Sequence, residues 1–265
     1  MRLKALIFDV DGTLADTEEA HRCAFNEAFR VHALQWNWNR ATYAQLLSVG
    51  GGKERLQAYI DSLPLAAAER VLLARRIPAL HRTKTAIYTA ALLAGGVRLR
   101  DGVALLLEEC VGARVKLAIA STTTAANIDV LLSSNLGADA IKWFSVIGAG
   151  DVVDRKKPAP DIYEWTLDRL QEAPANCVAI EDSANGLRAA KAAGLFTVVI
   201  PTRWTMGEDL SAADLVLPYL GSPAHPLTEI AAAHIGSTRL GVRELEQQLT
   251  GQPARLQREA GRRRQ

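Results

Sequence analysis

The sequence predicts an α/β fold: a doubly wound parallel sheet with a helical domain inserted after the first strand. Three observations support this prediction. Short apolar runs alternate with helical segments between residues 116 and 216, as is typical of a parallel sheet covered by helices. Polar residues capable of chemistry follow four of the apolar runs, where ligands bind in such sheets. Between residues 16 and 93 the alternation stops and the pattern is helical.

The predicted elements divide the chain into a core, a cap and a tail. Apolar runs that end in turn residues predict strands, and helical spacing of apolar residues predicts helices. Strands are expected within residues 1–14 and at 117–120, 144–147, 178–180, 197–200 and 215–217. Cap helices are expected at 18–29, 40–48, 53–62, 66–77 and 80–94. We assign residues 1–15 and 94–220 to the core domain, 16–93 to the helical cap domain, and 221–265 to an irregular basic tail with one helix near 241–249.

The first strand ends in two carboxylates two positions apart, Asp9 and Asp11. Side chains at i and i+2 of an extended chain point the same way, so the two converge on one small volume. Gly12 then allows a sharp turn. Such a pair can supply a nucleophile, a proton carrier and oxygen ligands for Mg²⁺. An acidic turn is the alternative, and the motifs that follow favour the catalytic interpretation.

Two further motifs suit phosphate binding. Ser121, Thr122 and Thr123 follow an apolar run and offer hydroxyl and backbone N–H groups to a phosphate oxygen. Such clusters also cap helices, and here both roles can coexist. Lys157, next to Pro158, is a positioned charge that suits a phosphate dianion, or alternatively belongs to a solvated basic loop.

An acidic pair, Glu181 and Asp182, follows the next apolar run. Two adjacent buried carboxylates are costly unless a cation or hydrogen bonds compensate them. Mg²⁺ takes oxygen ligands and one or two carboxylates, so the pair is a candidate metal site. An acidic helix N-terminus, favoured by the helix dipole, is the alternative.

Taken in order, the four motifs resemble the signature of the haloacid dehalogenase superfamily of phosphotransferases. The resemblance implies that Asp9 is the nucleophile that becomes an aspartyl-phosphate and that Asp11 is the general acid/base. It also implies that Ser121 and Lys157 bind the phosphate. The implied cofactor is Mg²⁺, with Asp9, the main-chain carbonyl of Asp11, and Asp182 as ligands and Glu181 as ligand or support.

The cap is expected to select the substrate. Glu18 and His21 share a helix face just beyond the nucleophile loop and could meet a sugar hydroxyl, or they could be ordinary surface or core residues. The glycines at 50–52, followed by Lys53 and Arg55, could form an anion cradle or a flexible loop before a helix. The candidate substrate-contacting residues are Glu18, His21, Tyr43, Gly51, Gly52, Lys53, Arg55, His81, Lys84, Ser121, Thr122, Thr123 and Lys157.

The cap and core motifs together are similar to those of the CbbY-type phosphatases of autotrophic bacteria. That resemblance implies a sugar bisphosphate as substrate, xylulose-1,5-bisphosphate, which is an inhibitory by-product of the carboxylase Rubisco. Such a substrate needs a second phosphate site, which the loop around Lys53 and Arg55 would supply. A β-phosphoglucomutase-like mutase and a phosphoglycolate phosphatase remain alternatives, since both share the catalytic motifs.

Composition agrees with a globular enzyme of the cytoplasm. The chain has 265 residues, with 49% hydrophobic and 23% charged residues. Its three scattered cysteines suggest free thiols. Residues 239–265 hold seven arginines against three glutamates, so the basic charge belongs to the tail. We expect no signal peptide, no membrane segment and no nucleic-acid surface, and we expect a monomer.

Overall fold

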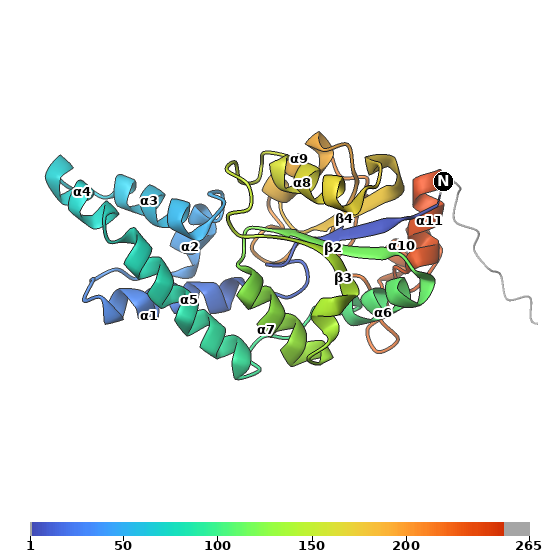
Figure 1. Cartoon of the computed structure of the whole chain (residues 1–265), viewed down its shortest axis with the longest axis horizontal. Coiled ribbons are helices and arrows are strands. Elements are labelled where there is room, and N and C mark those ends of the chain that lie inside the picture. The colour runs from blue at the N-terminus through green and yellow to red at the C-terminus, as the bar shows by residue number, and fades with distance from the viewer. Residues whose placement is uncertain (1, 252–265) are drawn as a thin grey trace, which may run out of the picture.

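A computed structural model describes residues 2–251 of the chain and shows a six-stranded parallel sheet (Figure 1). The strand order is β3-β2-β1-β4-β5-β6, so the first strand lies in the middle. This confirms the doubly wound parallel sheet predicted from the alternating pattern. The strands are β1 (Ala5–Phe8), β2 (Lys116–Ser121), β3 (Phe144–Ala149), β4 (Cys177–Glu181), β5 (Phe196–Val199) and β6 (Leu215–Val216).

Helices cover both faces of the sheet because successive side chains of each strand point to opposite faces. Leu6 and Phe8 of β1 pack in one cluster and Ala5 and Ile7 in another. The first cluster includes side chains of α6 and α7, and the second includes those of α8 and α9. These helices are α6 (Val103–Ala113), α7 (Ala125–Leu136), α8 (Asp161–Leu170) and α9 (Ala184–Ala192), with short 3-10 turns η1 (Ala140–Trp143) and η2 (Pro174–Asn176) before β3 and β4.

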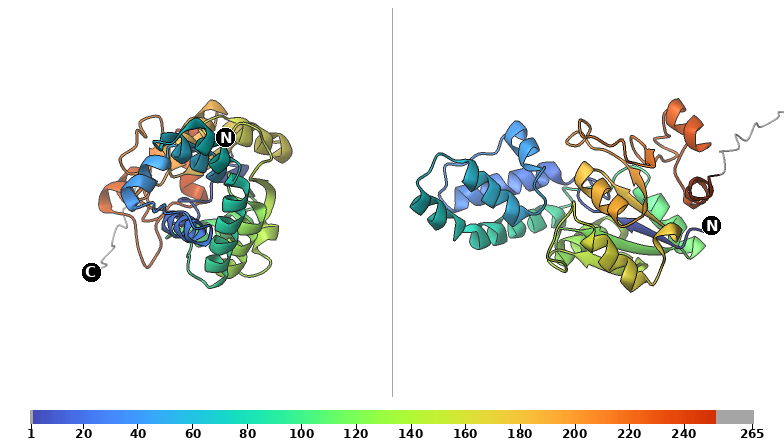
Figure 2. Two further views of the ribbon diagram at one scale, coloured as in Figure 1. Left: turned by 90° about the vertical axis from the view of Figure 1, so that its left-hand side faces the viewer. Right: turned by 90° about the horizontal axis from the view of Figure 1, so that it is seen from above.

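Five helices between β1 and α6 form a separate body, which we call the cap (Figures 1 and 2). The cap has its own aromatic core, centred on Trp38, with Phe25, Phe29 and Tyr43 around it. The chain leaves and re-enters the sheet domain side by side, since Ala15 bridges to Leu99. The helices are α1 (Glu18–Val31), α2 (Arg40–Leu46), α3 (Gly52–Ser62), α4 (Ala67–Ala74) and α5 (Ile77–Leu93).

The expectation of an irregular tail from residue 221 is wrong for the part that the structure describes. A helix, α10 (Glu229–Ile235), was not predicted, and α11 (Val242–Thr250) confirms the helix expected near 241–249. These helices pack on the main core through buried Ile235 and Leu245, and Leu240 between them is buried in the same cluster. Glu109 of α6 accepts a hydrogen bond from the Val242 amide at 3.1 Å and thereby caps α11. Residues 252–265, the rest of the predicted tail, lie outside the described residues.

Among residues 2–251, no helix is both long enough and apolar enough to cross a membrane.

Candidate active site

The site lies at the carboxyl ends of β1, β2 and β4, as expected for a parallel α/β sheet. Asp9 follows β1, Ser121 ends β2, and Glu181 ends β4. Register pairs β1 with both other strands, so their ends meet at one edge. A cavity of about 140 Å³ opens there between the core and the cap. Its walls include the predicted residues Asp9, Asp11, Glu18, His21, Gly51, Gly52, Arg55, His81, Lys84, Ser121, Thr122, Thr123, Lys157, Glu181 and Asp182.

Lys157 holds the candidate nucleophile in place. Its Nζ lies 2.7 Å from Oδ1 of Asp9 and 2.6 Å from Oε1 of Glu181. Tyr163 of α8 donates its hydroxyl to the same Glu181 oxygen. Burial alone would lower the pKa of Lys157, but the carboxylates of Asp9 and Glu181 raise it above its ordinary value. Lys157 therefore carries its charge beside the carboxylate that would attack phosphorus.

The carboxylates at this edge suit a divalent cation. Oxygen atoms of Asp9, Glu181 and Asp182 lie within 4.8 Å of one another, and all three residues are buried. Lys157 is within ion-pair distance of Asp9 and Glu181. The cluster of three carboxylates and one ammonium therefore has a formal excess of two negative charges. Burial, together with the neighbouring carboxylates, raises the pKa of Asp182 well above its ordinary value. This donor set fits Mg²⁺, which prefers hard oxygen ligands.

The glycine after Asp11 makes room for this acidic cluster. Gly12 has φ +87°, and a Cβ added there would lie 2.2 Å from Oδ2 of Asp182. Any other residue would both strain the backbone and displace the carboxylate. The predicted sharp turn at Gly12 thus has a second purpose, the close approach of Asp182.

Burial would raise the pKa of Asp9, and the carboxylates of Glu181 and Asp11 add to this effect, while Lys157 opposes it. The net result is a pKa of about 7 for Asp9. A cation bound beside Asp9 would favour the ionised form that a nucleophile needs. The site therefore fits the predicted cofactor in charge as well as in ligand type.

Asp11 is held by residues at the start of the cap. Thr17 donates its hydroxyl to Oδ1 at 2.6 Å, and Nε2 of His21 lies 2.9 Å from the same oxygen. The other ring nitrogen of His21 lies 2.7 Å from Nζ of Lys84, and its ring stacks on Tyr88 at 3.9 Å. Burial alone would raise the pKa of Asp11, but His21, Thr17 and Lys84 together lower it below its usual range.

The hydroxyl residues after β2 form a second wall of the cavity. Ser121 is buried, and its Oγ accepts a hydrogen bond from the Thr123 amide at 3.3 Å. Thr124 caps α7 by accepting from the Asn127 amide at 3.4 Å. One short segment therefore both caps α7 and lines the cavity, so the two predicted roles coexist. Its N–H groups and hydroxyls suit phosphate oxygens.

The cap contributes Glu18 and Arg55, which are joined by a tyrosine. The Tyr43 hydroxyl donates to Oε2 of Glu18 at 2.6 Å and accepts from Nη1 of Arg55 at 3.1 Å. Tyr43 was expected to contact substrate, but it is fully buried in the cap core and does not line the cavity. Its predicted role as a direct contact is therefore wrong, and it orients two residues that do line the cavity.

Lys53 does not reach the catalytic cavity. Its Nζ pairs with Asp151 of the core at 2.8 Å, and it lines an adjoining cavity of about 660 Å³ instead. Lys53 and Arg55 are two positions apart on α3, so their side chains point about 200° apart around the helix axis. The prediction that both line one anion site beside the catalytic residues is therefore wrong for Lys53.

Several residues at the site carried no sequence signal. In the sequence Tyr163 occupies a position on the buried face of an amphipathic helix, which indicates a packing role. Only the structure shows that its hydroxyl also contacts Glu181. Thr205 and Glu208, from the loop after β5, also line the cavity. Asn185 lines the cavity and also donates to the carbonyl of Ser48 in the cap at 2.9 Å. Their spacing from the motifs predicts none of these contacts.

Comparison with known proteins identifies the class. The family of haloacid dehalogenase-like hydrolases matches residues 3–194, and a second family, described as HAD-hydrolase-like, matches residues 155–238. The chain belongs to the haloacid dehalogenase-like hydrolases, and it is a phosphoric monoester hydrolase.

Within that class the chain is similar to CbbY proteins. It is 48% identical to the plasmid CbbY of Cupriavidus necator over 227 residues, which cover 86% of this chain and 89% of that protein. The crystal structure of CbbY from Rhodobacter sphaeroides with phosphate matches with a TM-score of 0.76 and 42% identity, covering 84% of this chain and 98% of that one. A second structure of that CbbY, an aspartate-to-asparagine variant, contains xylulose-1,5-bisphosphate and matches equally well, with a TM-score of 0.76.

Proposed function

We propose that this protein is a Mg²⁺-dependent phosphatase that converts xylulose-1,5-bisphosphate to xylulose-5-phosphate and so removes an inhibitor of Rubisco. One observation carries the proposal: a single cavity holds Asp9 and Lys157 on the core side and Arg55 on the cap side. A sugar with two phosphates can present one to each. The bisphosphate bound to the similar CbbY of Rhodobacter sphaeroides supports this choice of substrate.

The proposed reaction has two steps. A carboxylate oxygen of Asp9 attacks phosphorus, and the bond from phosphorus to the sugar oxygen breaks as that oxygen takes a proton from Asp11. Asp11 then accepts a proton from water, which attacks the aspartyl-phosphate and releases inorganic phosphate. In the structure the pKa of Asp11 lies below its usual range, so the carboxyl group is ionised. The negative charge of a bound phosphate would raise this pKa, as protonation of the leaving oxygen requires.

The remaining residues stabilise the charges. Lys157 and the hydroxyl of Ser121 face the phosphate that is transferred. Asp9, Asp182 and the main-chain carbonyl of Asp11 would hold Mg²⁺, which would neutralise part of the charge between the phosphate and the attacking carboxylate. Glu181 orients Lys157, because Lys157 and Tyr163 already occupy its Oε1.

The test is a panel of sugar mono- and bisphosphates, scored for phosphate release and for isomerised product. We expect the highest kcat/KM with xylulose-1,5-bisphosphate. Isomerised product without net phosphate release would show a mutase instead. Preference for a monophosphate would contradict the proposed substrate but not the phosphatase chemistry.

Two variants test the second phosphate site. Loss of a charged hydrogen bond costs about 1.5–3 kcal/mol, so Arg55→Ala should lower kcat/KM for the bisphosphate about tenfold to a hundredfold. The same variant should change kcat/KM for p-nitrophenyl phosphate little. Lys53→Ala is the matched control from the same helix, and we expect less than about threefold change with either substrate. Equal losses on both substrates in Arg55→Ala would contradict a distal phosphate site there.

A further inference from the structure

A loop of the core reaches the cap beside the active site. The loop, residues 201–208, follows β5 and is held by its own threonines. The Thr202 amide donates to Oγ1 of Thr205 at 2.9 Å, and the Trp204 amide donates to Oγ1 of Thr202 at 3.1 Å. Both threonines are buried. The backbone of Trp204 is therefore held within the loop, and Arg100 joins the loop to the core by donating to the Pro201 carbonyl at 3.0 Å.

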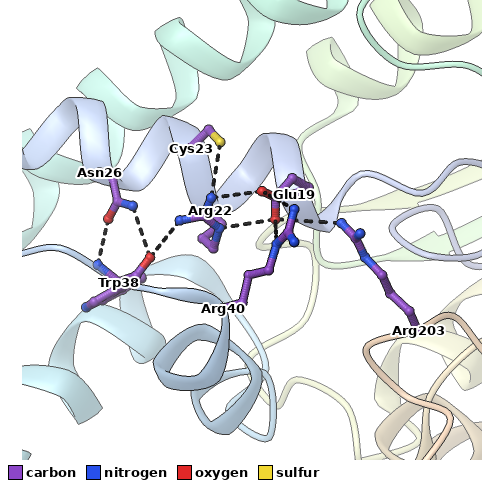
Figure 3. A network of polar contacts seen from close by, with 7 residues as sticks. All are labelled: Glu19, Arg22, Cys23, Asn26, Trp38, Arg40 and Arg203. Carbon is purple, nitrogen blue, oxygen red and sulfur yellow. Dashed lines mark hydrogen bonds and ion pairs between the residues drawn. The ribbon is translucent and has the colours of Figure 1, made fainter.

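Two side chains of this loop contact the cap. The indole of Trp204 packs edge-on against the ring of Tyr43, with centroids 5.6 Å apart and planes at 80°, and it joins the aromatic core of the cap. Next to it, Arg203 extends toward Glu19 of α1, with Nη2 3.7 Å from Oε2. Figure 3 shows Glu19 between this core arginine and two cap arginines, Arg22 and Arg40. Two consecutive core residues thus contact α1 and α2.

The contact with Tyr43 leads directly to the cavity. The hydroxyl of Tyr43 bonds Glu18 at 2.6 Å and Arg55 at 3.1 Å, and both of those side chains line the cavity. The guanidinium of Arg55 also lies 5.3 Å from the centre of the Tyr43 ring. The Tyr43 ring also packs on Phe25 and Trp38 of the cap, and Trp204 adds a contact from the core. A change at Trp204 can therefore reach Glu18 and Arg55 through the Tyr43 hydroxyl.

The same loop also touches the catalytic side. Thr205 and Glu208 line the cavity, and Glu208 accepts a hydrogen bond from the Ala184 amide, two residues after Asp182. One short segment therefore contacts both the chain just after Asp182 in the core and Tyr43 in the cap.

We propose that Trp204 is a positioning residue for substrate selection: its indole, packed on Tyr43, places Glu18 and Arg55 at the correct distance from Asp9 when cap and core are together. The proposal rests on the proposed function insofar as Arg55 contacts the part of the substrate that is not cleaved. Trp204 itself does not line the cavity, so it acts through Tyr43 and not by touching the substrate.

The experiment compares Trp204→Ala with Trp204→Phe, which keeps an aromatic edge against Tyr43. With the sugar phosphate that the wild-type protein prefers, Trp204→Ala should raise KM about tenfold and change kcat less than about twofold, because it removes binding that ground state and transition state share. Trp204→Phe should return KM to within about threefold of wild type. Kinetics with p-nitrophenyl phosphate should stay unchanged in both variants. Met206→Ala, at an exposed position of the same loop, is the matched control and should behave as wild type.

An unchanged KM in Trp204→Ala, an equal loss with p-nitrophenyl phosphate, or a failure of Trp204→Phe to restore KM would each overturn the proposal. Preference of the wild-type protein for a monophosphate would contradict only the proposed substrate, since the Trp204 comparison is then made with that monophosphate. A crystal structure of Trp204→Ala gives a readout independent of activity. We expect the contact of Tyr43 with Glu18 or Arg55 to be lost, and an unaltered Glu18–Tyr43–Arg55 cluster would refute the role of Trp204.

Discussion

Lys84 determines which nitrogen of His21 carries the proton, and that nitrogen faces Asp11. The lysine Nζ lies 2.7 Å from Nδ1 of His21, and an ammonium group can only donate a hydrogen bond. Nδ1 is therefore the acceptor, and Nε2 carries the proton that it donates to Asp11 at 2.9 Å. Because His21 and Lys84 lie on α1 and α5 of the cap and Asp11 lies on the core, the position of the cap sets the orientation of the carboxylate that transfers protons.

Replacing His21 by alanine should lower kcat for xylulose-1,5-bisphosphate about tenfold to a hundredfold, since a positioned acid/base contributes about 10²–10⁴-fold and Asp11 keeps only its Thr17 hydrogen bond. Steady-state kinetics measure the effect. His32→Ala is the control, because His32 lies just beyond the same helix and bonds Thr83 away from the cavity. A wild-type rate in His21→Ala would mean that this hydrogen bond is not needed.

Lys84→Met should alter how stability depends on pH. Burial lowers the pKa of Lys84 from 10.5 to about 8. Below pH 8 Lys84 is protonated in both the folded and the unfolded chain, and the full cost of burying its charge lowers the free energy of unfolding. Between pH 8 and 10.5 the unfolded chain binds more protons, so the wild-type protein gains stability as pH rises, by at most about 3 kcal/mol.

The variant lacks this titration, so its free energy of unfolding should fall relative to wild type across the same pH range. Chemical unfolding at several pH values measures the difference. If the free energy of unfolding changes with pH in the same way in both proteins, burial does not lower the pKa of Lys84.

Asp182→Asn should weaken Mg²⁺ binding. A ligand that binds only the folded protein raises its stability, by about 2.7 kcal/mol at a hundred times its Kd. We expect Mg²⁺ to raise the melting temperature of the wild-type protein and to have most of this effect removed in Asp182→Asn, because Asp182 belongs to the buried carboxylate cluster. Asp139→Asn, at an exposed carboxylate paired with Lys142, should keep the full effect. An equal Mg²⁺ response in Asp182→Asn would exclude Asp182 as a ligand.

Leu245→Ala should destabilise the protein by about 2–5 kcal/mol, the usual cost of a large-to-small change in a core. Leu245 of α11 is fully buried against the sheet domain. Leu72→Ala is the matched control, since Leu72 on α4 is 61% exposed, and we expect a change within about 0.5 kcal/mol. Denaturant unfolding measures both. A neutral Leu245→Ala would mean that α11 adds little to the fold.

Local patterns were sufficient for the sheet and for most helices. Each strand is a short apolar run, and chain direction in a parallel sheet brings the residues after β1, β2 and β4 to one edge. Asp9, Ser121 and Asp182 could therefore be assigned to one site without coordinates. The prediction of an irregular segment after residue 221 was wrong, because its helices are short and its composition is rich in proline, glycine and alanine. Its order comes from burial of Ile235, Leu240 and Leu245 against distant residues.

The fold class, the four catalytic motifs and the family could be predicted from the amino-acid sequence, because these depend on residues that are neighbours in the chain or lie at the ends of adjacent strands. The structure was needed to show which cap side chains line the cavity and which do not. Lys53 and Arg55 are both basic, yet helix geometry turns one toward Asp151 and the other into the cavity. Lys84 meets His21 across 63 positions and Trp204 meets Tyr43 across a domain boundary. The first contact depends on how α1 and α5 pack within the cap, and the second on how the cap meets the core. Neither can be inferred from residues that are close in sequence.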